Sequence, residues 1–153
     1  MKTESYIVFI LNDEEYGIEI KYTQEILRIP NHIMHLPNMP FYIEGIINIR
    51  GTVIPIIDLK KRFNLPQKER NSDSRLLILD LEDTKLAIIV DDVSEIMNIN
   101  ESDIQTLNSV MCKIGQNSLN QIVNLNRERL ILLLNVTNLK TDIFTYNKEM
   151  EEV

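Results

Sequence analysis

Few side chains in this sequence have the type and spacing needed for catalysis or metal binding. His32 and His35 lie three residues apart in IPNHIMHLP, without a further Cys or His at metal-ligand spacing, so we interpret them as loop histidines. Asp91 and Asp92 follow the apolar run LAIIV, where strand alternation would send them to opposite faces; they indicate a solvated strand end more than an acid–base pair. Cys112 is the only cysteine and cannot form an internal disulfide. These residues predict neither a catalytic nor a metal site.

Glycine spacing and charge argue against nucleotides and nucleic acids as ligands. The four glycines form neither GxGxxG nor GxxxxGK, so no phosphate-binding loop is recognisable. The chain of 153 residues has 16 Lys and Arg against 23 Asp and Glu, a formal net charge of -7. Binding to nucleic acid requires basic residues gathered on one face, and here they are scattered. We therefore predict no enzyme, no cofactor and no nucleic-acid partner, and we expect the partner to be protein.

One charged side chain interrupts an otherwise apolar, β-branched run. Arg50 and Gly51 lie at the centre of GIINIRGTVIPIIDL, residues 45–59. The pair can be a hairpin turn in which Gly51 supplies the permissive backbone and Arg50 is merely exposed. It can also present Arg50 to a partner, because the rigid fork of guanidinium donors suits carboxylates and backbone carbonyls. The residues alone favour the plain turn.

An internal repeat organises the elements that would position this pair. Residues 6–27, YIVFILNDEEYGIEIKYTQEIL, align without a gap on residues 76–97, LLILDLEDTKLAIIVDDVSEIM, at an offset of 70. Each copy predicts a strand, an acidic turn, a second strand and a further extended segment. The stretch from Ile49, IRGTVIPIIDL, matches NRERLILLLNV from Asn126 at an offset of 77, so about seven extra residues fall in the polar loop 98–118.

The repeat also predicts how each half ends. Asp58 and Asn135 occupy matching positions, and both residue types are preferred helix N-caps. The first helix would run through DLKKRFNL to Pro66, and the second, NVTNLKTDIF, places three apolar residues at helical spacing to cover an apolar surface, namely Val136, Leu139 and Ile143.

These boundaries divide one domain, residues 1–153, into halves of about 5–66 and 75–146. The polar stretch LPQKERNSDS, residues 65–74, is the predicted linker, and residues 147–153 form an acidic tail that we expect to be solvated. A copy of about 70 residues buries only about 60% of its surface alone, so the copies should share a core. Short strands with frequent turns favour two small antiparallel SH3-like β-barrels, mainly β in class, with an apolar joint that can form a groove.

The run from Gly45 closely resembles the signature of the CheW family, the bacterial chemotaxis coupling proteins: G-[VI]-x-N-x-R-G-x-[VI]-[VIL]-P-[VI]-[VI]-D-L. Four further stretches resemble family segments in the expected order, so that the resemblance covers about residues 5–144: YIVFILNDEEYGIEI, QEILRIP, LPNMPFYIEG and LAIIVDDVSEIM. The sequence departs at Ala87, where Gly is usual, and at Asn135, where Asp is usual. Arg127 and Glu128 replace small turn residues, which leaves the shape of the second tip open.

The resemblance implies a cytoplasmic scaffold without catalytic activity. Such proteins have two β-barrel subdomains and bridge methyl-accepting chemoreceptors to the regulatory domain of the histidine kinase CheA, which places them at membrane arrays through protein contacts. No apolar run approaches the roughly 18 residues of a membrane span, and the N-terminus lacks the features of a signal peptide. We expect a single-domain coupling protein. A CheW-like module of another chemosensory system, such as one for type IV pili, or a competing paralogue is the alternative.

The resemblance also reverses the interpretation of Arg50. The matching Arg of the family belongs to the receptor-binding surface, and Glu25 lies at the other receptor-contact segment. Thr23, two residues before Glu25 on the same predicted strand, should point the same way. We expect Arg50, Glu25 and Thr23 to flank the groove between the halves. Gly51 would let the tip approach closely, and Gly45 would mark a bend or a close backbone approach.

Overall fold

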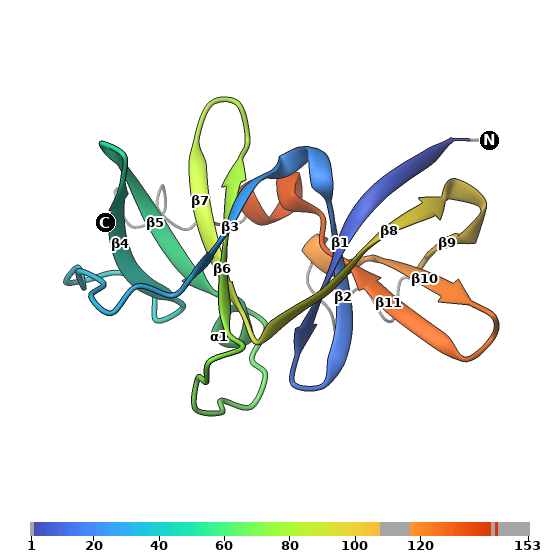
Figure 1. The fold of residues 1–153 in the computed structure, drawn as a ribbon, viewed down its shortest axis with the longest axis horizontal. Coiled ribbons are helices and arrows are strands. Elements are labelled where there is room, and N and C mark those ends of the chain that lie inside the picture. Colours follow the sequence, from blue (N-terminus) through green and yellow to red (C-terminus); the bar gives the residue numbers. More distant parts are fainter. Residues whose placement is uncertain (1, 108–116, 142, 144–153) are drawn as a thin grey trace.

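The computed structural model describes residues 2–107, 117–141 and 143 of the chain, and within them the strands form two sheets (Figure 1). The six-stranded sheet has the order β8-β1-β2-β11-β10-β9, with β1 Thr3–Leu11, β2 Glu14–Glu19, β8 Asp92–Asn100, β9 Ile104–Thr106, β10 Gln121–Leu125 and β11 Arg129–Leu133. The five-stranded sheet has the order β3-β6-β7-β5-β4, with β3 Thr23–Arg28, β4 Ile43–Ile49, β5 Thr52–Asp58, β6 Arg75–Asp80 and β7 Lys85–Val90. We call the two units the six-stranded and the five-stranded barrel; they confirm the predicted mainly β fold with two subdomains.

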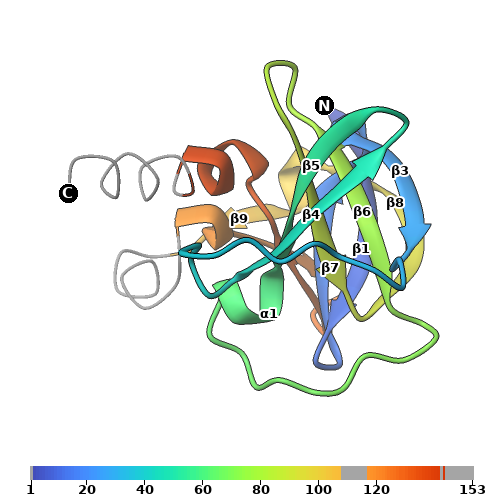
Figure 2. The same ribbon diagram turned by 90° about the vertical axis from the view of Figure 1, so that its left-hand side faces the viewer.

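Short helices connect and cover the barrels. Helix α1, Leu59–Arg62, follows β5, and a second helix spans 136–141 (Figure 2). Three 3-10 turns lie between strands: η1 Ile20–Tyr22, η2 Glu101–Asp103 and η3 Asn117–Leu119. No helix in the described ranges is long and apolar enough to cross a membrane. Cys112 and the predicted acidic tail lie outside the described residues.

Both predicted N-caps are present. The Asp58 side chain accepts a hydrogen bond of 3.2 Å from Lys61 N, and the Asn135 side chain accepts one of 2.9 Å from Asn138 N. Helix α1 ends at Arg62, earlier than the predicted Pro66. Asn64 has a φ of +57°, and a left-handed residue just past the last turn terminates a helix before any proline is needed.

The two barrels do not coincide with the two halves of the sequence repeat. The hairpin β1–β2 of the first half joins β8 to β11 of the second half, whereas β6–β7 of the second half joins β3 to β5 of the first. Each exchange creates one parallel contact, between β2 and β11 and between β5 and β7, in otherwise antiparallel sheets. Both hairpins carry the same hydrophobic pattern, so the sequence could predict the strands but not which copy each hairpin would join.

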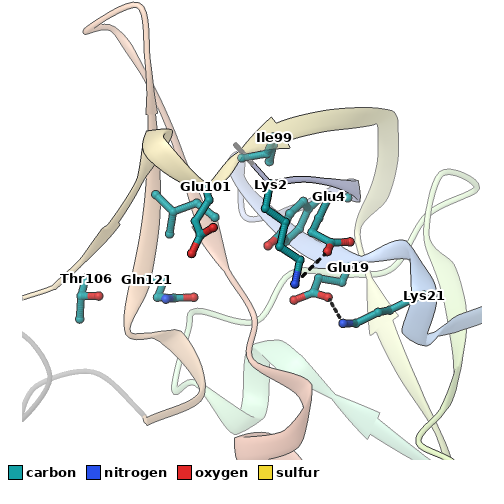
Figure 3. A pocket seen from close by; sticks show the side chains of 10 residues that line it. Lys2, Glu4, Glu19, Lys21, Ile99, Glu101, Thr106 and Gln121 are labelled. Carbon is teal, nitrogen blue, oxygen red and sulfur yellow. Dashed lines mark ion pairs between the residues drawn. The ribbon is translucent and has the colours of Figure 1, made fainter.

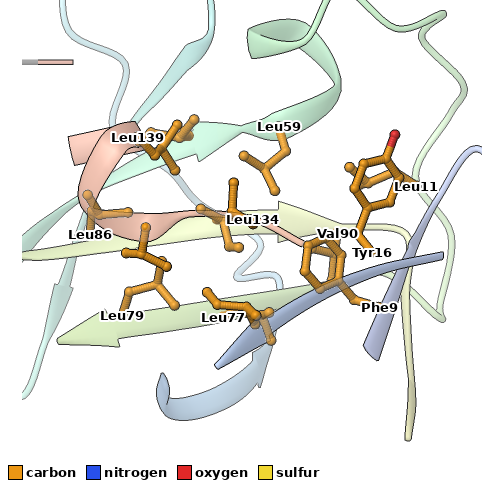
Figure 4. Packing of buried hydrophobic residues seen from close by; sticks show 14 of the residues in the cluster. Phe9, Leu11, Tyr16, Leu59, Leu77, Leu79, Leu86, Val90, Leu134 and Leu139 are labelled. Carbon is orange, nitrogen blue, oxygen red and sulfur yellow. The ribbon is translucent and has the colours of Figure 1, made fainter. Parts of the chain in front are cut away.

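Three clusters of buried apolar side chains fill the molecule. The six-stranded barrel encloses Tyr6, Val8, Ile99, Val123, Ile131 and Leu133. The five-stranded barrel encloses Ile47, Ile54, Ile56, Leu76, Ile78, Ala87 and Ile89. The largest cluster, the joint core, lies between the barrels and takes side chains from both sheets, from α1 and from the C-terminal helix, among them Phe9, Leu11, Tyr16, Leu59, Leu77, Leu79, Val90, Leu134 and Leu139 (Figure 4). The joint is therefore apolar, as predicted.

Strand β6 shows why the sequence contains continuous apolar runs. Alternation along the strand sends Leu76 and Ile78 into the five-stranded barrel and Leu77 and Leu79 into the joint core. Both faces of β6 are thus buried, and a strand buried on both faces has no polar period. The helix at 136–141 covers the same joint, since Val136, Leu139 and Ile143 are buried as their spacing predicted.

Candidate partner-binding site

Arg50 and Gly51 form the two-residue tip of the β4–β5 hairpin. Ile49 pairs with Thr52, and the φ angles of Arg50 and Gly51 are +49° and +86°, which is the type I′ turn preferred in such hairpins. Asn48 Oδ1 accepts a hydrogen bond of 2.9 Å from Gly51 N. A left-handed conformation costs a non-glycine residue roughly 1–2 kcal/mol, so the protein holds Arg50 in a strained position.

The structure brings Arg50 and Glu25 together. The guanidinium of Arg50 forms an ion pair with the carboxylate of Glu25 on β3. Because β3 and β4 are the two edges of the five-stranded sheet, the pair helps to close the barrel, as does the bridge between Met34 and Ile46. The Arg50 side chain is still 68% exposed, whereas that of Glu25 is 22% exposed. The guanidinium can therefore contact another molecule while Glu25 holds it in place.

A bulge in β3 separates Thr23 from Glu25. Thr23 lies opposite Leu79 and Glu25 opposite Ile78, so Gln24 is an extra residue in the pairing with β6. Paired residues share a face, and Leu79 belongs to the joint core whereas Ile78 faces the barrel interior. The expectation that Thr23 and Glu25 point the same way is wrong, because strict alternation does not hold across a bulge. Thr23 Oγ1 is buried and has no hydrogen-bond partner among the residues that the structure describes.

The two glycines of the hairpin have different surroundings. Gly45 lies at a register shift between β4 and β5 with a φ of +149°, and a Cβ there would be 2.2 Å from Met34 O. Apart from its chain neighbours, no atom of the described residues lies within 4 Å of the Cβ position at Gly51. Gly45 is thus required by a close backbone approach, and Gly51 only by its positive φ.

Asp58 caps α1 and also belongs to a charged network. It is buried, and its Oδ2 lies 3.1 Å from Arg70 Nη2 in the loop 65–74. Arg70 also lies 3.2 Å from Glu44 on β4, and Lys61 lies 2.5 Å from the same carboxylate. Burial acts to raise the pKa of Glu44, but the hydrogen bonds from Lys61 and Arg70 hold the pKa below its usual value. The network fastens the loop to β4 and α1.

Asp91 makes a contact that the sequence did not indicate. Lys60 of α1 is 4% exposed, and its Nζ lies 2.8 Å from Asp91 Oδ1. The other oxygen of Asp91 accepts a hydrogen bond of 2.8 Å from Asn12 N. The prediction of a solvated strand end is wrong for Asp91 because this buried cation takes up its carboxylate. Asp92 is exposed, as expected. A lysine in a short polar helix gives no sequence signal of burial.

A polar hollow of about 410 Å³ lies on the six-stranded barrel (Figure 3). Four of its charged side chains form two local ion pairs, Lys2 with Glu4 at 3.5 Å and Lys21 with Glu19 at 3.0 Å. Burial and the neighbouring carboxylates of Glu19 and Glu4 raise the pKa of Tyr6 to about 12, so the phenol stays protonated at neutral pH and is no general base. Within the described residues, no three His, Cys, Asp or Glu side chains converge as metal ligands would.

An apolar groove of about 460 Å³ runs along the outer edge of the five-stranded barrel. It is lined by Pro30, His32, Met34, Ile46, Ile47, Asn48, Ile49 and Val53. Met34 is 55% and Val53 60% exposed, and both line the same groove. Exposed apolar side chains that lie together mark interaction surfaces more often than single ones do. The groove begins beside the Arg50 tip, since Ile49 precedes Arg50 and Val53 follows three residues later.

The exposed apolar side chains recur at matching positions of the repeat. Val53 corresponds to Leu130 at the offset of 77, and Ile26 corresponds to Ile96 at the offset of 70; all four are exposed. The carboxylate of the first ion pair has a counterpart as well, because Glu95, the equivalent of Glu25, lies 2.5 Å from Arg129. The equivalent of Arg50 is Arg127, so a different arginine of the second hairpin makes this contact.

The second tip, whose shape the sequence left open, joins β10 to β11 through residues 126–128. Asn126 and Arg127 both have a positive φ, and Glu128 N donates to Leu125 O at 3.2 Å. Both barrels thus end in a left-handed hairpin tip beside an exposed apolar side chain.

Comparison with known proteins identifies the family. Residues 5–143 match the model of the CheW-like domain. The chain is 35% identical to the chemotaxis protein CheW of Treponema pallidum, over 83% of this chain and 76% of the relative, and 35% identical to that of Bacillus subtilis, over 78% and 76%. The crystal structure of the scaffolding protein TtCheW from Thermoanaerobacter tengcongensis superposes with a TM-score of 0.79 at 33% identity, covering 89% of this chain and 86% of that one. The chain therefore belongs to the CheW-like domain family and serves as a scaffold in chemotaxis.

Proposed function

We propose that this protein couples membrane chemoreceptors to the histidine kinase CheA by binding both and catalysing neither. The observation that carries the proposal is the Arg50 tip: a strained turn and the Glu25 carboxylate hold a mostly exposed guanidinium at a fixed place. An arginine that served only solubility would need neither constraint. The protein would then reside in the cytoplasm at receptor arrays, held there by protein contacts.

The receptor face extends from this tip over the edge strands β3 and β8. Ile26 lies opposite Leu77 and Ile96 opposite Ile7, and both opposite residues belong to the joint core. Ile26 and Ile96 thus extend the apolar surface of the joint core to the outside of the protein. Their exposed fractions are 41% and 64%. An amphipathic helix of a receptor tip offers apolar side chains for such a surface and carboxylates or carbonyls for Arg50.

The kinase face includes the apolar groove at Val53 and its counterpart at Leu130. The regulatory domain of CheA resembles this family and therefore has two β-barrels of the same kind. Each of those barrels can pack its end against one barrel end of this protein. The chain exposes 9419 Å², and three interfaces of about 800 Å² each would cover about a quarter of it. One receptor and two kinase contacts therefore fit together on one molecule.

The test is receptor binding by an Arg50→Glu variant. If Arg50 is a central anchor, the variant should bind a soluble receptor signalling fragment more weakly by about 2 kcal/mol or more, with little change in melting temperature. Arg127→Glu is the matched control, because Arg127 is also an exposed arginine in a left-handed tip, and it should keep wild-type receptor affinity.

A charge swap separates direct contact from internal support. Arg50→Glu combined with Glu25→Arg restores an ion pair between β3 and the tip but moves the cation away from position 50. Receptor affinity should stay low in this double variant. Recovery of wild-type affinity would mean that the pair only braces the barrel, and an unaltered affinity of Arg50→Glu alone would remove Arg50 from the receptor face.

A further inference from the structure

Within residues 2–107, the chain passes between the barrels at two places. It leaves the six-stranded barrel through η1, after β2, and returns to it at Asp91, between β7 and β8. The first crossing is tied by the ion pair between Lys21 and Glu19, whose side chains are 54% and 29% exposed. Exposed pairs of this kind contribute little to a fixed geometry.

The second crossing is held from both sides. Asp91 N donates to Ile10 O at 2.9 Å, and its carboxylate accepts from Asn12 N at 2.8 Å; both partners belong to the six-stranded barrel or its first turn. The remaining oxygen lies 2.8 Å from Lys60 Nζ on α1, which extends from β5 of the five-stranded barrel. One carboxylate thus joins the two barrels at the residue where the backbone crosses.

Because Lys60 is buried, its ammonium group is favourable only in a geometry that keeps the Asp91 carboxylate close. The Lys60 side chain is 6% exposed, and an ammonium removed from water to this extent requires a nearby anion in good geometry. The joint core supplies adhesion between the barrels, but apolar burial is non-directional and scales with area. The Asp91 side chain is 26% exposed, so the pair is buried on the Lys60 side only. Its favourable geometry restricts the angle that the apolar joint alone would leave free.

We propose that Lys60 and Asp91 are positioning residues that fix the angle between the barrels and so connect receptor binding to control of the kinase. The receptor face lies across both barrels, whereas each kinase contact, at Val53 or at Leu130, lies on one barrel. If the angle between the barrels is fixed, a movement of the receptor on one face displaces the kinase contact on the other. If the angle is free to vary, the barrels reorient and the kinase contact does not move. Neither residue belongs to the receptor face or the groove. The connection to signalling rests on the proposed function; the fixed angle does not.

The first experiment measures the angle in the full chain. Spin labels are placed at Thr52 on β5 and Asn124 on β10, both exposed, with Cys112→Ser to prevent labelling there. Wild type should give one narrow distance distribution. Lys60→Met and, as a second variant of nearly unchanged shape, Asp91→Asn should broaden or split it, while the control Lys21→Met at the other crossing should not. A distribution that stays narrow in a folded Lys60→Met or Asp91→Asn protein would overturn the proposal.

The second experiment measures coupling with a receptor signalling fragment and CheA. The Lys60 and Asp91 variants should bind the CheA regulatory domain with wild-type affinity and the receptor fragment more weakly, because the receptor face lies across both barrels. At receptor concentrations that saturate binding, receptor-dependent control of CheA activity should still be lost. Retained control despite a broadened distance distribution would refute the signalling part. A wild-type chain that bound neither partner would contradict the proposed function instead, and the label distances would still decide whether the pair fixes the angle.

Discussion

At the scale of single residues, Arg50 combines backbone strain with an exposed ion pair. Its left-handed conformation costs roughly 1–2 kcal/mol, and its exposed pair with Glu25 returns about 0–1 kcal/mol. Asparagine tolerates this turn position better than other side chains except glycine. Arg50→Asn should therefore change the free energy of unfolding in urea by less than about 1 kcal/mol while weakening receptor binding. A destabilisation well beyond this would show that Arg50 is a structural residue first.

Gly45 and Gly51 provide a matched test of close approach. Gly45→Ala places a Cβ 2.2 Å from a backbone oxygen in a conformation that favours glycine, so the strand must shift and we expect a loss of about 3 kcal/mol or more. Gly51→Ala meets open space and should cost about 1 kcal/mol through its positive φ alone. Urea unfolding of both variants checks the order. An equal loss of unfolding free energy in the two variants would mean that the Met34 backbone can move away from the new Cβ at little cost.

At the scale of elements, β5 buries one face from Ile54 onward, whereas its opposite face is exposed at Val53 and buried at Ile57. Ile56 is fully buried in the five-stranded barrel, whereas Val53 on the same strand is 60% exposed. Ile56→Asp should unfold the protein, because a carboxylate would be buried without a partner. Val53→Asp should stay folded and lose affinity for the CheA regulatory domain. Circular dichroism and a binding titration separate the two effects, and a soluble, folded Ile56→Asp protein would contradict the facing of β5.

The sequence predicted elements well and their partners less well. Short apolar runs separated by acidic turns located the strands β1, β2, β6 and β7, and the caps at Asp58 and Asn135 located both helix starts. The exchange of hairpins between the barrels could not be predicted, because the hairpins of both copies have the same hydrophobic pattern and either one would fit either barrel. The bulge that turns Thr23 away from Glu25 depends on pairing with β6, which local sequence does not encode. Burial of Lys60 likewise arises only from tertiary packing.

At the scale of the whole molecule, the joint core binds the two barrels into one unit. It contains side chains of both sheets and of both helices, so neither barrel keeps its apolar surface covered without the other. The loop 65–74, which connects the halves of the repeat, is fastened as well: Asn12 Nδ2 donates to Pro66 O at 2.8 Å, and Arg70 reaches Asp58 and Glu44. These contacts keep the two barrels in one arrangement, which a scaffold needs in order to hold several partners in fixed relative positions.

This fastening makes stability depend on pH through Glu44. Its pKa is held below the usual value in the folded protein, so its contribution is fully present above the unfolded pKa of about 4.3 and is lost as pH falls through the lower folded value. Glu44→Gln should therefore lower the free energy of unfolding by about 1 kcal/mol at pH 7, and the difference from wild type should shrink as the pH falls below about 4.3. Urea unfolding across this range measures it. If the two proteins lost stability in parallel on acidification, the pairing of Glu44 with Lys61 and Arg70 would not be what secures β4, α1 and the loop to one another.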